Sequence, residues 1–295
     1  MLLRVIHETA YEYDPPVQHA LHVAHLRPLG HGTQRLLEHA LHIDPTPDQC
    51  TQDVDAHGNA RAYFGLPFTH GTLRVRADSV VDTLARPAPA PGLPWEAVRE
   101  HLAYRRGAPY VEAAQFCFAS PYVPLHEDFA HYARACFTPG RPLMEAAAAL
   151  MSRIHQDFAY APQATDAGTP ALEALRLRRG VCQDFAHVLT GCLRSLGLAA
   201  RYASGYLLTR PPPGQPRLVG ADASHAWVSV WSPGPDGGAW HDLDPTNDRA
   251  PGEDYVTLAL GRDYADVAPL RGVIHGSGRH VLRVAVTVAP LQEMA

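Results

Sequence analysis

The chain has 295 residues, of which 46% are hydrophobic and 19% are charged, and its formal net charge is −5. This composition is ordinary for a globular protein with a sizeable core, and the length allows one large or two modest domains. No run of Lys or Arg offers a surface for nucleic acid or anionic membranes, and no segment approaches the roughly 20 apolar residues of a transmembrane helix. Because the start of the chain becomes polar too soon for a targeting peptide, we expect a cytoplasmic protein without nucleic-acid or membrane partners.

Residues 1–85 alternate between apolar and polar side chains in several short runs, a pattern typical of strands with one buried face. Turn signals separate the runs, among them Asp14-Pro15-Pro16 and His57-Gly58-Asn59. We therefore predict an N-terminal antiparallel β domain, a small sandwich or barrel. The positions assigned to the buried faces are Leu3 and Val5, then Ala20, His22, Ala24 and Leu26, then Leu37, His39, Leu41 and Ile43, then Leu73, Val75 and Ala77.

Prolines mark the predicted boundary between two parts of the chain. Residues 86–95 are rich in proline, which fits neither a regular helix nor a central strand. Segments of this kind are semi-rigid spacers, so we predict a linker there. The second part then spans residues 96–295.

Helical periodicity dominates the beginning of this second part. Apolar residues recur every three or four positions, which indicates helices with one buried face. Thr169 and Pro170 predict the start of a short helix, with Thr169 as the N-cap and Pro170 at the first helical position. The apolar stripes are Leu125, Phe129, Tyr132 and Cys136, and then Leu143, Ala147, Leu150, Ile154 and Phe158.

A well-bounded helix is predicted to begin at or near Cys182 and to end with a left-handed cap at Gly197. Strand patterns follow at residues 200–208, 224–231 and 281–288. Helices first and strands after predict an α+β core of helices packed on an antiparallel sheet, with the C-terminal strands included in this core. The apolar stripe of the helix is Phe185, Leu189, Cys192 and Leu196.

Cys182 differs from the other cysteines by its position. A thiol in the first turn of a helix lies beside unpaired backbone N–H groups and the positive end of the helix dipole, which favour the thiolate. Arg178 and Arg179 would add to this effect if their side chains lie close. On position alone, a reactive thiol and an inert buried thiol are equally good interpretations of Cys182, whereas we expect inert thiols elsewhere. The other cysteines, which include no Cys-x-x-Cys pair, are Cys50, Cys117, Cys136 and Cys192.

Together with Cys182, the residues His225 and Asp244 provide a nucleophile, a base and a carboxylate in chain order. His225 belongs to a strand pattern with tryptophans, where partly dry surroundings suit a base, although a lone strand histidine is more often structural. Asp244 precedes a proline, which favours an extended conformation, although the same residues are also strong turn formers. Its carboxylate could accept a hydrogen bond from His225, whose other ring nitrogen would then face Cys182.

Two alternatives stay open at this point. The first is that another aspartate holds His225: Asp242 would share a strand face with Asp244 and is the rival, and Asp222 and Asp184 are lesser candidates. The second is a metal site, which we do not expect, because a Cys and a His five residues apart on a helix are not a usual zinc spacing. The ligands of such a site would be Cys182, His187, His225 and Asp242.

Several separated motifs resemble the bacterial transglutaminase-like superfamily and cover nearly the whole chain. Those of the core are residues 178–187 (Arg-Arg-Gly-Val-Cys-Gln-Asp-Phe-Ala-His), 201–207, 222–228 (Asp-Ala-Ser-His-Ala-Trp-Val) and 243–247 (Leu-Asp-Pro-Thr-Asn). Those of the accompanying N-terminal β domain are residues 11–17, 25–28 and 55–59 (Asp-Ala-His-Gly-Asn), and residues 261–267 resemble the downstream segment.

The resemblance implies a papain-like or transglutaminase-like core with a Cys-His-Asp triad. In it Cys182 is the nucleophile, His225 is the base and then the acid, and Asp244 orients His225. The backbone N–H of Cys182 is the expected oxyanion donor, with Tyr160 or Gln183 as the second. No cofactor is expected, and the acidic loops of calcium-dependent animal transglutaminases are not apparent.

The expected activity is acyl transfer from amide bonds of peptide or protein substrates through a thioester. We expect hydrolysis, as by a peptidase or amidase, because water is abundant and no acceptor-lysine site is recognisable. Transfer to an amine, as by a transglutaminase, is the alternative. A further alternative is a catalytically silent module whose β domain binds a peptide by edge-strand addition.

Overall fold

The computed structural model describes residues 1–30, 32–85, 92–107, 109–209, 224–235, 237–276 and 278–293. Most of the predicted linker and the candidate Asp222 lie outside these residues. None of the helices in the described ranges is long and apolar enough to cross a membrane.

The first part of the chain forms a β domain of two four-stranded antiparallel sheets. Side chains of β1 alternate between buried and less buried positions, as the period of two in its sequence predicts. One sheet has the order β14 (Arg279–Pro290), β1 (Leu2–Val17), β6 (His70–Thr83) and β3 (Gln34–Asp44). The other has the order β13 (Leu270–His275), β2 (His19–Ala24), β5 (Ala60–Leu66) and β4 (Gln49–Val54).

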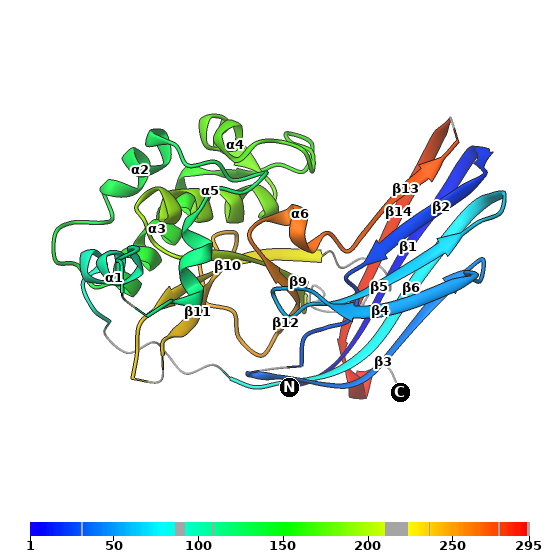
Figure 1. The fold of residues 1–295 in the computed structure, drawn as a ribbon, viewed down its shortest axis with the longest axis horizontal. Coiled ribbons are helices and arrows are strands. Elements are labelled where there is room, and N and C mark those ends of the chain that lie inside the picture. Colours follow the sequence, from blue (N-terminus) through cyan, green and yellow to red (C-terminus); the bar gives the residue numbers. More distant parts are fainter. Residues whose placement is uncertain are drawn as a thin grey trace.

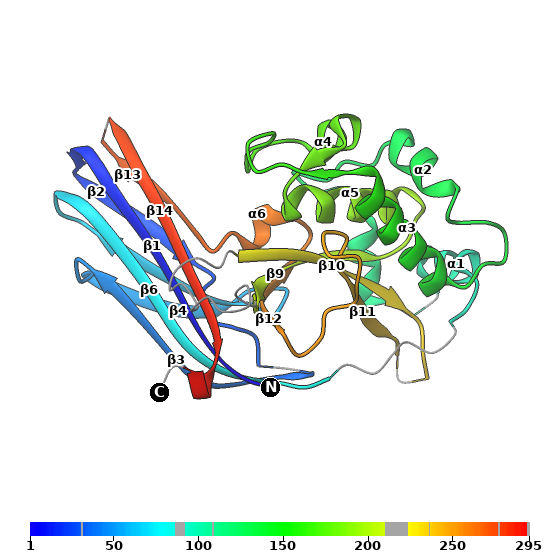
Figure 2. The same cartoon turned by 180° about the vertical axis from the view of Figure 1, so that it is seen from behind.

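The C-terminal strands belong to this β domain and not to the second part of the chain, so the predicted domain division is wrong at this end. β14 pairs with β1 along nearly its whole length, and β13 pairs with β2. Figure 2 shows β14, in red, beside β1, in blue. An alternating pattern identifies a strand but not its partner, since pairing depends on where the chain returns in space.

Two local predictions also need correction. The segment Asp14-Pro15-Pro16, predicted as a turn, lies inside β1, where the register with β6 shifts between Glu12 and Val17. The short helix predicted to be capped by Thr169 begins at Ala171, and the Thr169 hydroxyl instead accepts a hydrogen bond from the N–H of Asp166. The first correction removes a predicted turn, whereas the second moves a helix start by one residue.

The helices of the second part pack around α5 (Cys182–Ser195). The side chains from Asp184 to Arg194 are all buried, because other helices and the core sheet cover α5. Figure 1 shows these helices gathered on one side of that sheet. They are α1 (Trp95–Leu102), the 3₁₀ helix η1 (Glu112–Cys117), α2 (Glu127–Arg134), α3 (Leu143–Asp157) and α4 (Ala171–Leu177); α6 (Tyr264–Val267) and the 3₁₀ helix η2 (Leu291–Glu293) come later.

The core sheet is antiparallel and buried on both faces. Its order is β11 (Ala239–Leu243), β10 (Ser224–Ser232), β9 (Ala200–Leu207) and β12 (Tyr255–Gly261). Tyr202 belongs to the apolar cluster of the helices, whereas its neighbour Ala203, on the other face, belongs to a cluster with Leu29. The predicted fold class, α+β with an N-terminal antiparallel β domain, is confirmed. A short parallel pair, β7 (Ala159–Tyr160) and β8 (Arg179–Gly180), precedes α5.

Close packing across the core sheet requires glycine at position 205. Gly205 lies opposite His225 in the pairing of β9 and β10. A Cβ at this position would lie 2.1 Å from the carbonyl oxygen of Val256 and 2.6 Å from the Trp227 ring. Since one of these atoms belongs to the backbone of β12, a side-chain rotation cannot remove the overlap.

Replacing Gly205→Ala is expected to lower the free energy of unfolding by about 3 kcal/mol, the upper end of the usual cost of overpacking. Urea denaturation measures the change. Gly71→Ala is the matched control, because the nearest atom to its added Cβ would be 3.8 Å away. Equal stability of the two variants would contradict the expectation.

Candidate active site

Cys182 is the first residue of α5, and a polar cap fixes this helix start. The carboxylate of Asp184 accepts hydrogen bonds from the Val181 N–H at 2.8 Å and from the Thr165 hydroxyl at 2.7 Å. A Cβ at Gly180 would lie 2.3 Å from that carboxylate, so the cap requires glycine there. Asp184, a lesser candidate for the group that holds His225, therefore serves the helix start instead, in the manner of a capping box.

His225 and Asp244 form a buried pair. The Nε2 atom of His225 lies 2.7 Å from Oδ2 of Asp244, and their side chains are 9% and 0% exposed. Asp244 Oδ2 also accepts hydrogen bonds from the Asn247 amide and the Tyr255 hydroxyl, each at 2.7 Å. Its Oδ1 accepts from the N–H groups of Thr246, at 2.9 Å, and Asn247, at 3.3 Å. The carboxylate is therefore fully buried but well supplied with donors.

The charge on His225 follows from these contacts. Burial opposes the protonated ring, but the hydrogen bonds with Asp244 and Cys182 outweigh it and raise the pKa of His225 to about 9. Burial likewise opposes the charge of Asp244, yet the hydrogen bond from His225 and the other donors keep the pKa of this carboxyl below its ordinary value. Because Nε2 contacts Asp244, Nδ1 is the ring nitrogen left for the Cys182 thiol.

The structure brings Cys182, His225 and Asp244 together and leaves Asp242 apart. Asp242 lies within β11, opposite Ser229 of β10, and accepts a hydrogen bond from the Ser229 hydroxyl. β11 ends at Leu243, and Asp244 begins the turn that follows. Strand alternation predicted the same face for both aspartates, but only the residue beyond the strand end reaches His225.

Besides His225, tyrosines lie near Cys182, and the side chain of Arg178 lies elsewhere. Burial raises the pKa of Tyr160, and the nearby Cys182 adds to the shift. Tyr202 is fully buried and also close enough for Cys182 to contribute to its raised pKa. The guanidinium of Arg178 instead pairs with Asp157 at 3.4 Å. The predicted contribution of Arg178 to a thiolate is therefore not supported.

Gln183 and His187, the other residues considered near Cys182, serve the structure. The Gln183 amide donates to the carbonyl of Ala167 at 3.0 Å. His187 is fully buried, accepts a hydrogen bond from the Tyr264 N–H at 3.2 Å, and has its pKa lowered to about 3 by burial. Among the described residues, no group of three or more His, Cys, Asp or Glu side chains could hold a metal ion.

Tyr255 and Asn247 were missed as members of the site. Asn247 stands in the Leu-Asp-Pro-Thr-Asn motif, so its closeness to Asp244 could have been foreseen from the turn chemistry. Tyr255 begins β12, and no local pattern links it to Asp244. Only the packing of β12 beside β9 brings its hydroxyl to the carboxylate.

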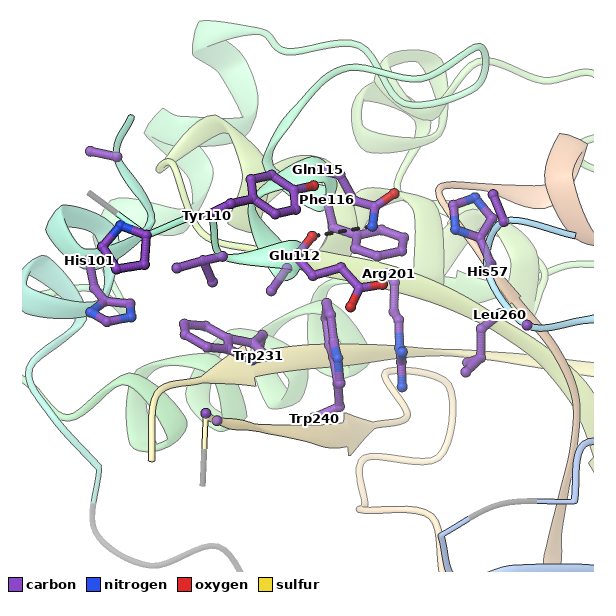
Figure 3. Close-up of a pocket in the computed structure, with 18 of the residues that line it drawn as sticks. His57, His101, Tyr110, Glu112, Gln115, Phe116, Arg201, Trp231, Trp240 and Leu260 are labelled. Carbon is purple, nitrogen blue, oxygen red and sulfur yellow. Dashed lines mark hydrogen bonds between the residues drawn. The ribbon is translucent and has the colours of Figure 1, made fainter. Parts of the chain in front are cut away.

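A cavity of about 840 Å³ lies away from Cys182, at the far end of β10 from His225. Figure 3 shows Trp231 and Trp240 beneath it, with Tyr110 and Phe116 on the opposite side. Stacking of His101 on Trp231 and of Arg201 on Trp240 already occupies ring faces of both tryptophans. Since Cys182, His225 and Asp244 are not among the residues that line it, this cavity does not belong to the site around Cys182.

Two family profiles match the chain. Residues 3–82 match the bacterial transglutaminase-like N-terminal region, and residues 130–245 match the transglutaminase-like superfamily core. The second match contains Cys182, His225 and Asp244.

Several relatives cover the whole chain or its core. Uncharacterized proteins of Mycobacterium tuberculosis and Mycobacterium leprae are 42% and 32% identical over 98% of this chain, and the matches span 93% and 99% of their lengths. A protein-glutamine gamma-glutamyltransferase of Pseudomonas aeruginosa is 36% identical over 42% of this chain and 19% of its own length. A crystal structure of a candidate cysteine protease from Cytophaga hutchinsonii has the same fold, with a TM-score of 0.76 and 20% identity over 99% of this chain and 91% of that one.

Replacing Asp244→Asn is expected to lower the pKa of His225 from about 9 to its ordinary value or below, because burial then acts without a compensating anion. Titration of the imidazole by NMR measures this, with Asp242→Asn as the control that should change nothing. An unchanged His225 pKa in Asp244→Asn would contradict the pairing.

The folded-state pKa of His225 lies above the ordinary 6.5, so the stability that His225 contributes is complete below about pH 6.5 and is lost as the pH rises through about 9.

Proposed function

Because this chain belongs to the transglutaminase-like superfamily and carries its bacterial N-terminal region, we propose that it is a thiol-dependent acyl-transfer enzyme that acts on amide bonds of peptides or proteins. The observation that carries the proposal is the placement of Cys182 at the start of α5, in contact with a histidine that a fully buried aspartate holds. A nucleophile, a base and an orienting group in hydrogen-bonded sequence are what covalent acyl transfer needs.

In the first step His225 holds the proton of the Cys182 thiol, and the sulfur, as the thiolate, forms a bond to the carbonyl carbon of the amide while the carbonyl π electrons move to the oxygen. The tetrahedral intermediate collapses as the carbon–nitrogen bond breaks, and protonated His225 gives its proton to the departing amine or ammonia. The raised pKa of His225, about 9, keeps the ring protonated at neutral pH and ready for this step. The product is a thioester on Cys182.

In the second step an acceptor attacks the thioester carbon. His225, now neutral, removes a proton from the acceptor, and the carbon–sulfur bond breaks to release Cys182. Asp244 remains ionised throughout and holds the imidazole in one orientation, which is the role of the carboxylate in such triads.

We assign the second oxyanion donor to Tyr160. The N–H of Cys182 at the helix start is the first donor. Tyr160 lies on β7, opposite Gly180, and its side chain is 58% exposed and close to Cys182. Gln183 is the weaker choice, because its amide already donates to Ala167.

Water is the proposed acceptor, which makes the enzyme a peptidase or amidase of the cytoplasm. Transfer to an amine is the second candidate, and the similarity to a protein-glutamine gamma-glutamyltransferase over 42% of the chain favours it. The two activities share the same thioester and differ only in what reaches it, so a single assay can separate them.

The Cys182→Ala variant is expected to lose at least about 10³-fold of the activity, because no other group can form the thioester. Wild type and variant are incubated with glutamine-containing peptides, with and without a fluorescent amine, while ammonia release, peptide cleavage and amine incorporation are measured. Cys50→Ala is the control, since this thiol is exposed in the β domain and should not matter.

Equal activity of wild type and Cys182→Ala would refute the nucleophile assignment. Incorporation of the amine in preference to hydrolysis would establish the second candidate. Specific binding of peptides without turnover by wild type, together with slow alkylation of Cys182 by iodoacetamide near pH 6, would favour the silent binding module.

Tyr160→Phe is expected to lower kcat by about 10²-fold, the usual loss on removing one oxyanion donor, with little change in KM. Gln183→Ala is the matched comparison and should retain the wild-type kcat. Steady-state kinetics of the two variants decide between them, and the reverse result would move the donor to Gln183.

A further inference from the structure

The β domain covers the free edge of the core sheet. β12 is the last strand in the order β11, β10, β9, β12, so only one of its edges pairs with another strand. Strand edges that carry unpaired N–H and C=O groups are a liability, and proteins cover them. Here two amide side chains of the β domain contribute to the cover, one at each end of β12, and the N–H of Leu29 also donates to the Thr257 carbonyl at 3.1 Å.

The Gln34 amide contacts β12 near its beginning. Its Oε1 accepts from the N–H of Thr257 at 2.7 Å, and its Nε2 donates to the carbonyl of the same residue at 2.8 Å. Nε2 also donates to the carbonyl of Leu29 at 2.6 Å. An amide that donates to and accepts from one residue reproduces the hydrogen-bonded pair of an antiparallel sheet.

Asn59 repeats this arrangement at the other end of β12. Its Oδ1 accepts from the N–H of Leu260 at 2.7 Å, and its Nδ2 donates to the carbonyl of Leu260 at 2.6 Å. The Asp55 carboxylate holds Asn59 in turn, through its side-chain amide and its backbone N–H, each at 2.9 Å. Figure 3 shows His57, from the same turn, beside Leu260. Residues 55–59 (Asp-Ala-His-Gly-Asn) thus hold the end of β12 through the Asn59 amide, which Asp55 keeps in place.

β12 is connected to the candidate active site through its first residue. The hydroxyl of Tyr255 donates to Oδ2 of Asp244, the same oxygen that contacts Nε2 of His225. The Tyr255 ring packs edge-on against Trp227 at 5.4 Å and is 1% exposed, so the hydroxyl moves only if β12 moves. Gln34 and Asn59 are 6% and 0% exposed, which means that solvent cannot replace them on β12.

We propose that Gln34 and Asn59 are positioning residues of the Cys182 site, which act through β12 and the Tyr255 hydroxyl to hold Asp244 against His225. The β domain then has a task in catalysis that does not require it to bind substrate. This inference rests on the proposed function for its effect on turnover, but its geometric content concerns only the His225–Asp244 pair.

The test compares the pKa of His225, measured by NMR, in wild type, Asn59→Ala, Gln34→Ala and Tyr255→Phe. Each variant is expected to lower this pKa by about one unit, since a looser Asp244 stabilises the imidazolium less. Gln52→Ala, an exposed amide on β4 of the same domain, is the control that should leave it unchanged. Amide hydrogen exchange at Thr257 and Leu260 should be faster in Gln34→Ala and Asn59→Ala respectively.

Kinetics provide the second readout. Each of the three variants is expected to lower kcat about 10-fold or more with KM nearly unchanged, since misplaced catalytic groups slow chemistry rather than binding. Asn59→Ala combined with Tyr255→Phe should cost no more than Tyr255→Phe alone, because both act through one contact.

Several outcomes would overturn the inference. A higher His225 pKa in Tyr255→Phe would mean that the hydroxyl only competes with His225 for the carboxylate. Strictly additive effects of Asn59→Ala and Tyr255→Phe, or a lower thermal stability with an unchanged His225 pKa, would mean that Gln34 and Asn59 only stabilise the fold. Tyr255→Phe keeps the ring and its packing, so it decides the question even where Asn59→Ala does not fold. If wild type shows no Cys182-dependent activity, the proposed function fails, but the NMR comparison still tests the positioning.

Discussion

The site around Cys182 depends on one buried contact, the hydrogen bond between the Asp244 carboxylate and the His225 ring. A carboxylate with no exposed surface costs several kcal/mol unless donors surround it. Asp244 meets this condition with donors from β10, from its own turn and from β12, so several separate segments must be in place before the pair can exist. The pair in turn makes His225 a protonated group at neutral pH, in a location where burial alone would keep it neutral.

Cys182 is placed by a different device at the opposite side of the site. Gly180 and Asp184 fix the start of α5, and the burial of this helix holds it against β9 and β10. The thiol therefore sits on a rigid helix and the imidazole on a rigid strand, the arrangement that keeps reacting groups aligned. The β domain completes this support, since it packs on Tyr206, Val256 and Leu258 of the core sheet and covers the edge of β12.

Under the proposed function, the same three side chains would serve hydrolysis and amine transfer equally well. Both proposed reactions pass through a thioester on Cys182, and both use His225 as acid and then as base. The difference lies in how water and amines reach the thioester, which depends on the walls around Cys182 rather than on the triad. The aromatic neighbours Tyr160 and Tyr202 belong to these walls, whereas the cavity lined by Trp231 lies too far along β10 to take part.

The fold class, the helix that begins at Cys182 and the strand that carries His225 could all be predicted from the sequence, because local periodicity and glycine caps act over short distances. The sequence also placed Asp244 among the candidates, but strand alternation could not separate it from Asp242. Tertiary structure decided that choice, brought Tyr255 to the carboxylate and returned the C-terminal strands to the β domain. Each of these depends on which strands pair in space, and strand pairing is set by the whole chain rather than by any one segment.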